Sequence, residues 1–207
     1  MSTHSSDSRD EVAATTSFLA EPPSSADTQR LFDADTEGLG YVMNVTRLWA
    51  HDPAALDGLS ELLGEVTRAG SLTLRQRSIL VTSCASTLGD SYCSLVWGKR
   101  LAEHAGNEAA AAVLRGDDAA LDVSERALAR WARRVADDPN STTVADVDEL
   151  RAAGFDDAQI FAITVYAALR LAFSTVNDAL GALPDRRLTH EVPSEIRDAV
   201  SFGRPIA

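Results

Sequence analysis

The residues best suited to chemistry lie around one turn of the chain. Cys93 follows Gly89-Asp90 and comes just after a long apolar stretch. Asp90 is a typical N-cap residue, so Cys93 is expected in the first turn of a helix, beside unpaired N–H groups and the positive end of the helix dipole. A thiol in that position can have a lowered pKa, and the thiolate is the reactive form. Cys93 is therefore a candidate redox residue. The alternative interpretation is a small buried hydrophobe, the usual role of a free cysteine.

The residues around Cys93 restrict what it can do. As an N-cap, Asp90 would bring a carboxylate to the backbone N–H of Cys93 and disfavour the thiolate by like charge. Asp90 is thus either a plain cap or a general acid or base in another reaction. Trp97 shares a helix face with Cys93 but cannot accept a proton. Ser78, on the preceding helix, cannot relay protons as a carboxylate would. We assign Ser78 and Trp97 to a substrate pocket.

Other candidates are weaker. Cys84 is expected on the buried face of the preceding helix, and a disulfide to Cys93 would need their Cα atoms within about 7 Å. The four histidines are scattered and show no metal-ligand spacing, so no metal site is predicted. No glycine-rich phosphate loop is present, and no cofactor is predicted. Several cations flank the turn, and one of them could bind an acidic substrate: Arg75, Arg77, Lys99 and Arg100.

The segment from Ser78 to Trp97 resembles the core of the alkyl hydroperoxidase D-like family, the carboxymuconolactone decarboxylase superfamily. In the redox-active branch, a Glu on the first helix precedes a C-x-x-C at the turn, and a His follows four residues after the second Cys. By this resemblance Cys93 corresponds to the second Cys and Asp90 to the first. Trp97 takes the place of the His, and Ser78 that of the Glu. Only one of the four residues is retained.

The resemblance extends over about two thirds of the chain. Peroxidase-related members share the order of an apolar helix, the turn, a helix, a charged helix, a D-P loop, a short helix and a long apolar helix. The matching sequence marks are Asp138-Pro139, Arg151-Ala152-Ala153-Gly154 and the run from Asn177 to Gly181. The resemblance implies an all-α, alkyl hydroperoxidase D-like helical bundle that forms homo-oligomers.

Three functions remain open. The first is a peroxidase-like oxidoreductase that uses Cys93 alone, with an external thiol as resolver. The second is a decarboxylase or related lyase acting on a small acid, as in the branch without the C-x-x-C. The third is a non-catalytic helical oligomer that keeps a small-molecule pocket. Because the resolving thiol and the proton relay are missing, weak or absent peroxidase activity is predicted.

Composition limits the partners. The chain has 207 residues and a net charge of -12, which disfavours a nucleic-acid backbone or an anionic membrane surface as partner. We see no apolar run long enough for a membrane span and no secretory signal at the N-terminus. Two cysteines are too few for a disulfide scaffold, and a cytoplasmic location is predicted.

Helix signals recur along the chain, and no sustained alternation predicts a strand. Thr73 with Gln76, Asp122 with Glu125 and Asp156 with Gln159 are predicted capping boxes. Helices are expected over residues 40–50, 53–70, 74–88, 91–105, 107–116, 123–135, 143–154 and 160–180.

The ends of the chain differ from its middle. Residues 1–26 are rich in Ser, Thr, Asp and Pro, and are predicted to be disordered or to form an arm on a partner subunit. Residues 27–183 are predicted to form one helical domain, and residues 184–207 a tail with one short helix after Pro193. The helix over 160–180 is apolar on nearly all faces, so a second copy of the chain is the expected partner.

Overall fold

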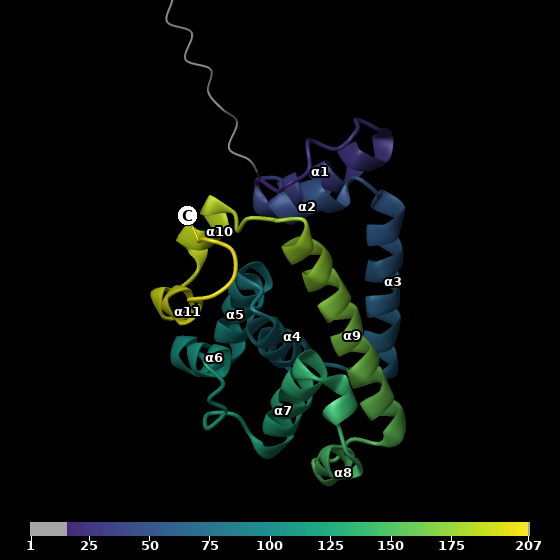
Figure 1. Cartoon of the computed structure of the whole chain (residues 1–207), viewed down its shortest axis with the longest axis vertical. Helices are drawn as coiled ribbons and strands as arrows, with labels where there is room; N and C mark the ends of the chain where they lie inside the picture. Colours follow the sequence, from purple (N-terminus) through teal and green to yellow (C-terminus); the bar gives the residue numbers. More distant parts are fainter. Residues whose placement is uncertain (1–15, 207) are drawn as a thin grey trace, which may run out of the picture.

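The computed structural model describes residues 16–206 of the chain, and these form α-helices and one short 3₁₀ turn without any strand. At the centre, α4 (Leu74–Leu88) and α5 (Ser91–Ala105) pack against each other across the Gly89-Asp90 turn (Figure 1). Gly89 has a φ of 85°, a left-handed conformation that glycine adopts without strain and that ends α4. The all-α fold and the central helix pair predicted from the sequence are confirmed.

Side-chain caps set where the long helices begin. The three predicted capping boxes are all present, at α4, at α7 (Val123–Asp137) and at α9 (Asp157–Ala179). A fourth box, Thr143 with Asp146, opens α8 (Val144–Ala152). The expected D-P loop is a 3₁₀ turn, Pro139–Ser141, where the Asp138 side chain accepts a hydrogen bond from the N–H of Asn140.

The core lies between α4 and the helices around it. α4 packs on α5, α7 and α9, while α6 (Asn107–Leu114) covers α5. α3 (Pro53–Ala69) packs on α9 along one flank of the molecule (Figure 1). The largest fully buried side chains come mainly from α4, α5, α7 and α9, among them Ile79, Leu80, Leu95, Leu101, Leu128 and Ile163.

The N-terminal part contains a helix that the sequence analysis missed. α1 (Ala26–Leu39) begins at Ser25, whose side chain accepts from the N–H of Thr28, and α2 (Asn44–Trp49) follows it. Residues 16–25, part of the predicted arm, lie against the end of α9, where the N–H of Phe18 donates to the carbonyl of Leu180 at 2.8 Å. Residues 1–15 of that arm lie outside the described residues.

The C-terminal tail has two helices where one was predicted. These are α10 (Arg186–Glu191) and α11 (Ser194–Ala199). α11 packs on α6 and α5, and its Ile196 is fully buried. The tail is therefore part of the bundle, because its apolar residues complete the cover over α5 and α6.

One sequence-based statement about membranes is wrong. α9 is long and apolar enough to cross a membrane by length and composition, although 33% of its most apolar window is buried inside this fold. The core helix of a water-soluble bundle has the same properties, and α9 contacts α3, α4, α7 and α8 here.

Candidate functional site

Cys93 lies in the first turn of α5, as its spacing from Asp90 predicts. The Asp90 side chain accepts a hydrogen bond from the backbone N–H of Cys93 at 2.9 Å. Asp90 is fully buried and Cys93 is 2% exposed. The second carboxylate oxygen of Asp90 is buried and has no hydrogen-bond partner among residues 16–206. A carboxylate thus lies at the base of the thiol.

A pocket of about 210 Å³ lies beside Cys93. Its walls come from α5, α9, α2 and the residue before α2. The side chains that matter for chemistry are Tyr92, Cys93, Trp97, Arg100, Arg170 and Phe173. The pocket therefore combines one thiol, three aromatic rings and two guanidinium groups.

The two arginines of the pocket lie close to its aromatic rings. The guanidinium carbon of Arg170 is 5.0 Å from the ring centre of Trp97 and 4.8 Å from that of Phe173. Arg100 lies 4.6 Å from the ring centre of Trp97. Nη2 of Arg170 is 3.6 Å from Sγ of Cys93. No carboxylate of the described residues forms an ion pair within 4.0 Å of either arginine.

The thiol of Cys93 is held in its neutral form. Burial, and then the charge of Asp90, raises its pKa to about 12, although Arg170 acts in the opposite direction. The helix N-terminus would lower the pKa of the thiol, but the rise in pKa caused by burial is larger. Burial likewise raises the pKa of Cys84 to about 12, and both cysteines are free thiols.

The structure brings together three of the four residues singled out from the sequence. Cys93 and Trp97 line the pocket, and Asp90 lies directly below Cys93. Ser78 is fully buried in α4 and donates to the carbonyl of Leu74 at 2.9 Å. Ser78 is not among the side chains that line the pocket.

Sequence reasoning missed three contributors. Arg170 and Phe173 come from α9, and only the tertiary packing of α9 on α4 brings them to the pocket. Tyr92, in the first turn of α5, is the third contributor. Tyr92 lines the pocket, and its hydroxyl donates to the carboxylate of Asp185, which also caps the N–H of Asn44.

The C-terminal segment covers the turn that carries Asp90. Gly203 lies so close to this turn that a Cβ atom there would be 2.3 Å from the carbonyl oxygen of Gly89. The Ser91 hydroxyl donates to the carbonyl of Arg204, and Arg204 donates to the carbonyl of Asp178 at 2.7 Å. Burial, and then the charge of Asp90, raises the pKa of Asp178 to about 7.

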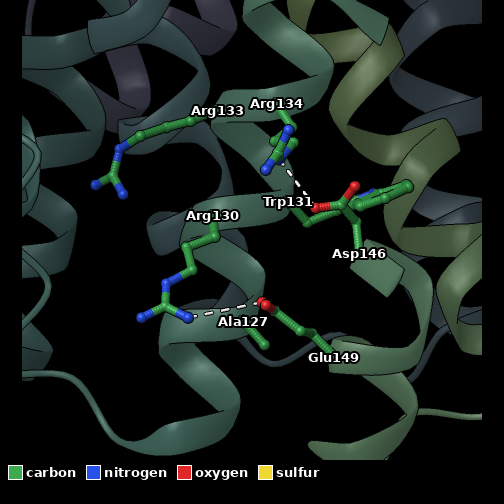
Figure 2. A pocket seen from close by; sticks show the side chains of 7 residues that line it. All are labelled: Ala127, Arg130, Trp131, Arg133, Arg134, Asp146 and Glu149. Carbon is green, nitrogen blue, oxygen red and sulfur yellow. Dashed lines mark ion pairs between the residues drawn. The ribbon is translucent and has the colours of Figure 1, made fainter. Parts of the chain in front are cut away.

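A larger hollow of about 380 Å³ lies elsewhere, between α7 and α8 (Figure 2). Arg134 pairs there with Asp146 at 2.9 Å, and Arg130 with Glu149 at 3.6 Å. Arg133 points away from them in Figure 2 and pairs with Asp118 through two hydrogen bonds. The cations of this groove are all neutralised by carboxylates. Within residues 16–206, no group of three or more His, Cys, Asp or Glu side chains has the arrangement of a metal site.

The helix order and the buried thiol at the central turn define an alkyl hydroperoxidase D-like fold, and comparison with solved structures agrees. The chain is similar to the alkylhydroperoxidase AhpD core of an uncharacterized peroxidase-related protein from Ralstonia eutropha JMP134, with 21% identity and a TM-score of 0.74 over 85% of this chain and 96% of that one. An uncharacterized peroxidase-related protein from Silicibacter sp. TM1040 gives 21% identity and a TM-score of 0.72 over 84% and 94%.

A third similar structure has a stated activity. It is the debrominase Bmp8, solved as a cysteine-to-alanine variant in complex with 2,3,4-tribromopyrrole, with 15% identity and a TM-score of 0.65 over 88% of this chain and 95% of that one. At these identities the likeness concerns the fold. No family model matches the sequence, and no curated protein matches it.

Proposed function

We propose that the chain is a member of the alkyl hydroperoxidase D-like superfamily in which the redox site has become a ligand-binding pocket, with weak or absent peroxidase activity. The observation that supports this most directly is the state of Cys93. With a pKa of about 12, the thiol would be ionised to only about one part in 10⁵ at pH 7. A thiol peroxidase needs the thiolate to attack the peroxide, so the first step is suppressed.

The remaining steps of a dithiol cycle also lack their groups. Asp90 occupies the place of the resolving cysteine, and a carboxylate cannot form the disulfide that releases a sulfenic acid. Cys84 is separately buried, with Sγ 3.6 Å from the carbonyl of Ala132 on α7. Trp97 fills the place of the proton-transferring His. What persists is a pocket with aromatic walls and cationic groups, which suits binding.

A second candidate is single-cysteine thiol chemistry, and one contact favours it. Arg170 donates towards the sulfur of Cys93, and a neighbouring cation favours the thiolate. Bmp8, which shares this fold at 15% identity, is a debrominase studied with a cysteine replaced. In such chemistry the thiolate would attack one oxygen of a peroxide, the O–O bond would break with release of water or an alcohol, and two external thiols would reduce the resulting sulfenic acid to the free thiol while forming a disulfide.

Peroxide consumption separates the two candidates. The assay follows hydrogen peroxide with dithiothreitol as reductant for the wild type, Cys93→Ser and the matched control Cys84→Ser. We expect all three to consume peroxide at the uncatalysed rate. Turnover in the wild type and in Cys84→Ser that disappears in Cys93→Ser would contradict the binding proposal and support the second candidate.

We further propose that copies of the chain associate through α3 and α9. α3 has no buried residue in the single chain, although its pattern is strongly amphipathic. Leu62 on α3 is 41% exposed and Phe161 on α9 is 71% exposed. Apolar surface of this extent is usually covered by a partner. Light scattering at micromolar concentration tests the proposal, and a monomer would contradict it.

A further inference from the structure

Arg100 of α5 and Arg170 of α9 line the Cys93 pocket, and Arg77 of α4 lines another hollow together with Tyr166 of α9. Burial lowers the pKa of Arg100, and the charges of Arg170 and Arg77 lower it further. Burial raises the pKa of Tyr166, and the same three cations oppose that rise. The three positive charges are thus close enough to one another to interact, on a ring that is 3% exposed.

No carboxylate of the described chain forms an ion pair with these arginines, and Glu103 acts on Arg100 only from a distance. None of the three arginines has a carboxylate oxygen within 4.0 Å among residues 16–206. Nε of Arg77 and Nε of Arg170 are buried without a hydrogen-bond partner there. By contrast Arg75, two residues before Arg77 on α4, forms a fork with both oxygens of Glu125. Arg77 and Arg170 are half-buried and Arg100 is exposed. Like charges that lie close together without carboxylate partners favour the binding of an anion.

The wall beside the cations is aromatic and flat. Arg100 and Arg170 both lie over the ring of Trp97. Phe173 completes this wall and stacks on Trp49, with ring centres 5.0 Å apart and an angle of 6°. The pocket volume of about 210 Å³ is below the roughly 300–1,000 Å³ of sites for drug-sized ligands, so the occupant is small.

We propose that Arg170 and Arg100 form an anion site in the Cys93 pocket that holds the carboxylate of a small aromatic acid, with the ring of that acid against Trp97 and Phe173. This rests on the proposed function, in which the pocket binds a ligand. The guanidinium fork matches the two oxygens of a carboxylate, and the flat hydrophobic wall matches the ring. Arg170 is central because it touches Trp97, Phe173 and the sulfur of Cys93.

Titration calorimetry with sodium benzoate tests the site, and benzamide serves as the neutral probe of nearly the same shape. We expect benzoate to bind the wild type at least about tenfold more tightly than benzamide, because only the carboxylate offers the guanidinium groups a charged acceptor. Equal affinities for the two probes would overturn the proposal, and so would the absence of benzoate binding.

Variants locate the binding to the two arginines. Arg170→Met should weaken benzoate binding roughly ten- to hundredfold, and the exposed Arg100→Met somewhat less. Arg170→Lys keeps the charge without the fork and should fall between wild type and Arg170→Met; it serves as the second variant if Arg170→Met does not fold by circular dichroism. The matched control is Arg130→Met in the α7–α8 groove, which should bind as the wild type does. Unchanged binding in Arg170→Met and Arg100→Met would overturn the site.

The benzoate-binding experiment tests the anion site independently of the peroxidase assay. If benzoate does not bind and no Cys93-dependent turnover is found, the anion site fails while the loss of peroxidase activity stands. If turnover depends on Cys93 but benzoate binding follows the arginines, the proposed function fails and the anion site stands. If benzoate does not bind and Arg170→Met changes the oligomer size in light scattering, a second copy supplies the counter-charge and the ligand proposal is wrong.

Discussion

The α7–α8 groove and the Cys93 pocket contain the same kind of side chain in opposite electrostatic situations. In the groove, Arg134 and Arg130 each have a carboxylate partner (Figure 2). In the pocket, Arg100 and Arg170 lie against rings and a thiol, with no carboxylate of the described residues in ion-pair contact. The groove is the larger hollow, at about 380 Å³ against about 210 Å³.

This difference indicates which of the two hollows is suited to bind an anionic ligand. An ion pair at a partly exposed surface satisfies both of its members, so the groove gains little by binding an anion. A cation in an aromatic pocket keeps unused donors, and the free energy of binding comes from satisfying them. The groove is therefore the larger hollow, but the pocket is the one whose arginines have no carboxylate partner among the described residues.

The largest expected effect on stability comes from breaking a groove-side pair. Arg133→Met should lower the free energy of unfolding by about 2–3 kcal/mol, because it leaves Asp118 partly buried without its two hydrogen bonds and frees the carbonyl of Val113. Urea unfolding measures it. Arg130→Met, whose pair with Glu149 is 3.6 Å long and exposed on both sides, is the control and should change little. Equal small losses in both would show that the Arg133 fork is not structural.

The carboxylates of the two regions should respond to pH in opposite directions. Hydrogen bonds from Thr143, and then Arg134, hold the pKa of Asp146 below its usual range, so its contribution to stability is lost as pH falls. Burial raises the folded-state pKa of Asp178 from its ordinary value of 3.8 to about 7. The folded state therefore binds the proton more tightly, and this contribution is lost as pH rises from about 4 to about 7.

Thermal melting of Asp178→Asn against the wild type across that interval checks the sign. The wild type should lose stability relative to Asp178→Asn as pH rises, and the difference should level off above about pH 7–8. Parallel curves over the interval would show that Arg204 and solvent keep Asp178 ionised throughout.

Much of the fold could be predicted because local signals agree with the tertiary structure. The three capping boxes and the glycine stop at Gly89 mark helix ends through contacts within four residues. α1 was missed because its composition is polar and only Thr28 and Leu31 are buried. α10 was missed because a six-residue helix is held by packing, here on α5, rather than by its own pattern.

The candidate site, too, could be predicted from the sequence only in part. Asp90, Cys93 and Trp97 share one helix, so their spacing alone predicted that they lie together. Arg170 and Phe173 enter from a helix some 80 residues later in the chain, and nothing local to them indicates the pocket. The neutral state of Cys93 was also beyond the sequence, since burial is its largest cause and burial is a property of the whole fold.

A smaller effect is expected on the thiol. Asp90→Asn keeps an N-cap acceptor but removes the charge that raises the pKa of Cys93. The rate of Cys93 alkylation by iodoacetamide at pH 8 should rise roughly tenfold, the equivalent of about one pKa unit. Cys84 is the internal control, because its raised pKa is due to burial and Asp90 is not among its causes. Mass spectrometry of each cysteine peptide gives both rates, and equal increases at the two sites would indicate partial unfolding instead.

The smallest change in stability is expected where an arginine of the pocket is removed. Arg170→Met loses its contacts with Trp97 and Phe173, each worth about 0.5–1 kcal/mol. It also removes repulsion with Arg100 and a buried donor that lacks a partner. These terms oppose each other, so the free energy of unfolding should stay within about 1 kcal/mol of the wild type. A loss as large as that of Arg133→Met would mean that Arg170 already has a counter-charge in the folded assembly.

Added benzoate provides a second comparison. It should raise the melting temperature of Arg130→Met as it does for the wild type, and it should leave that of Arg170→Met nearly unchanged, because a ligand stabilises only the folded state that binds it.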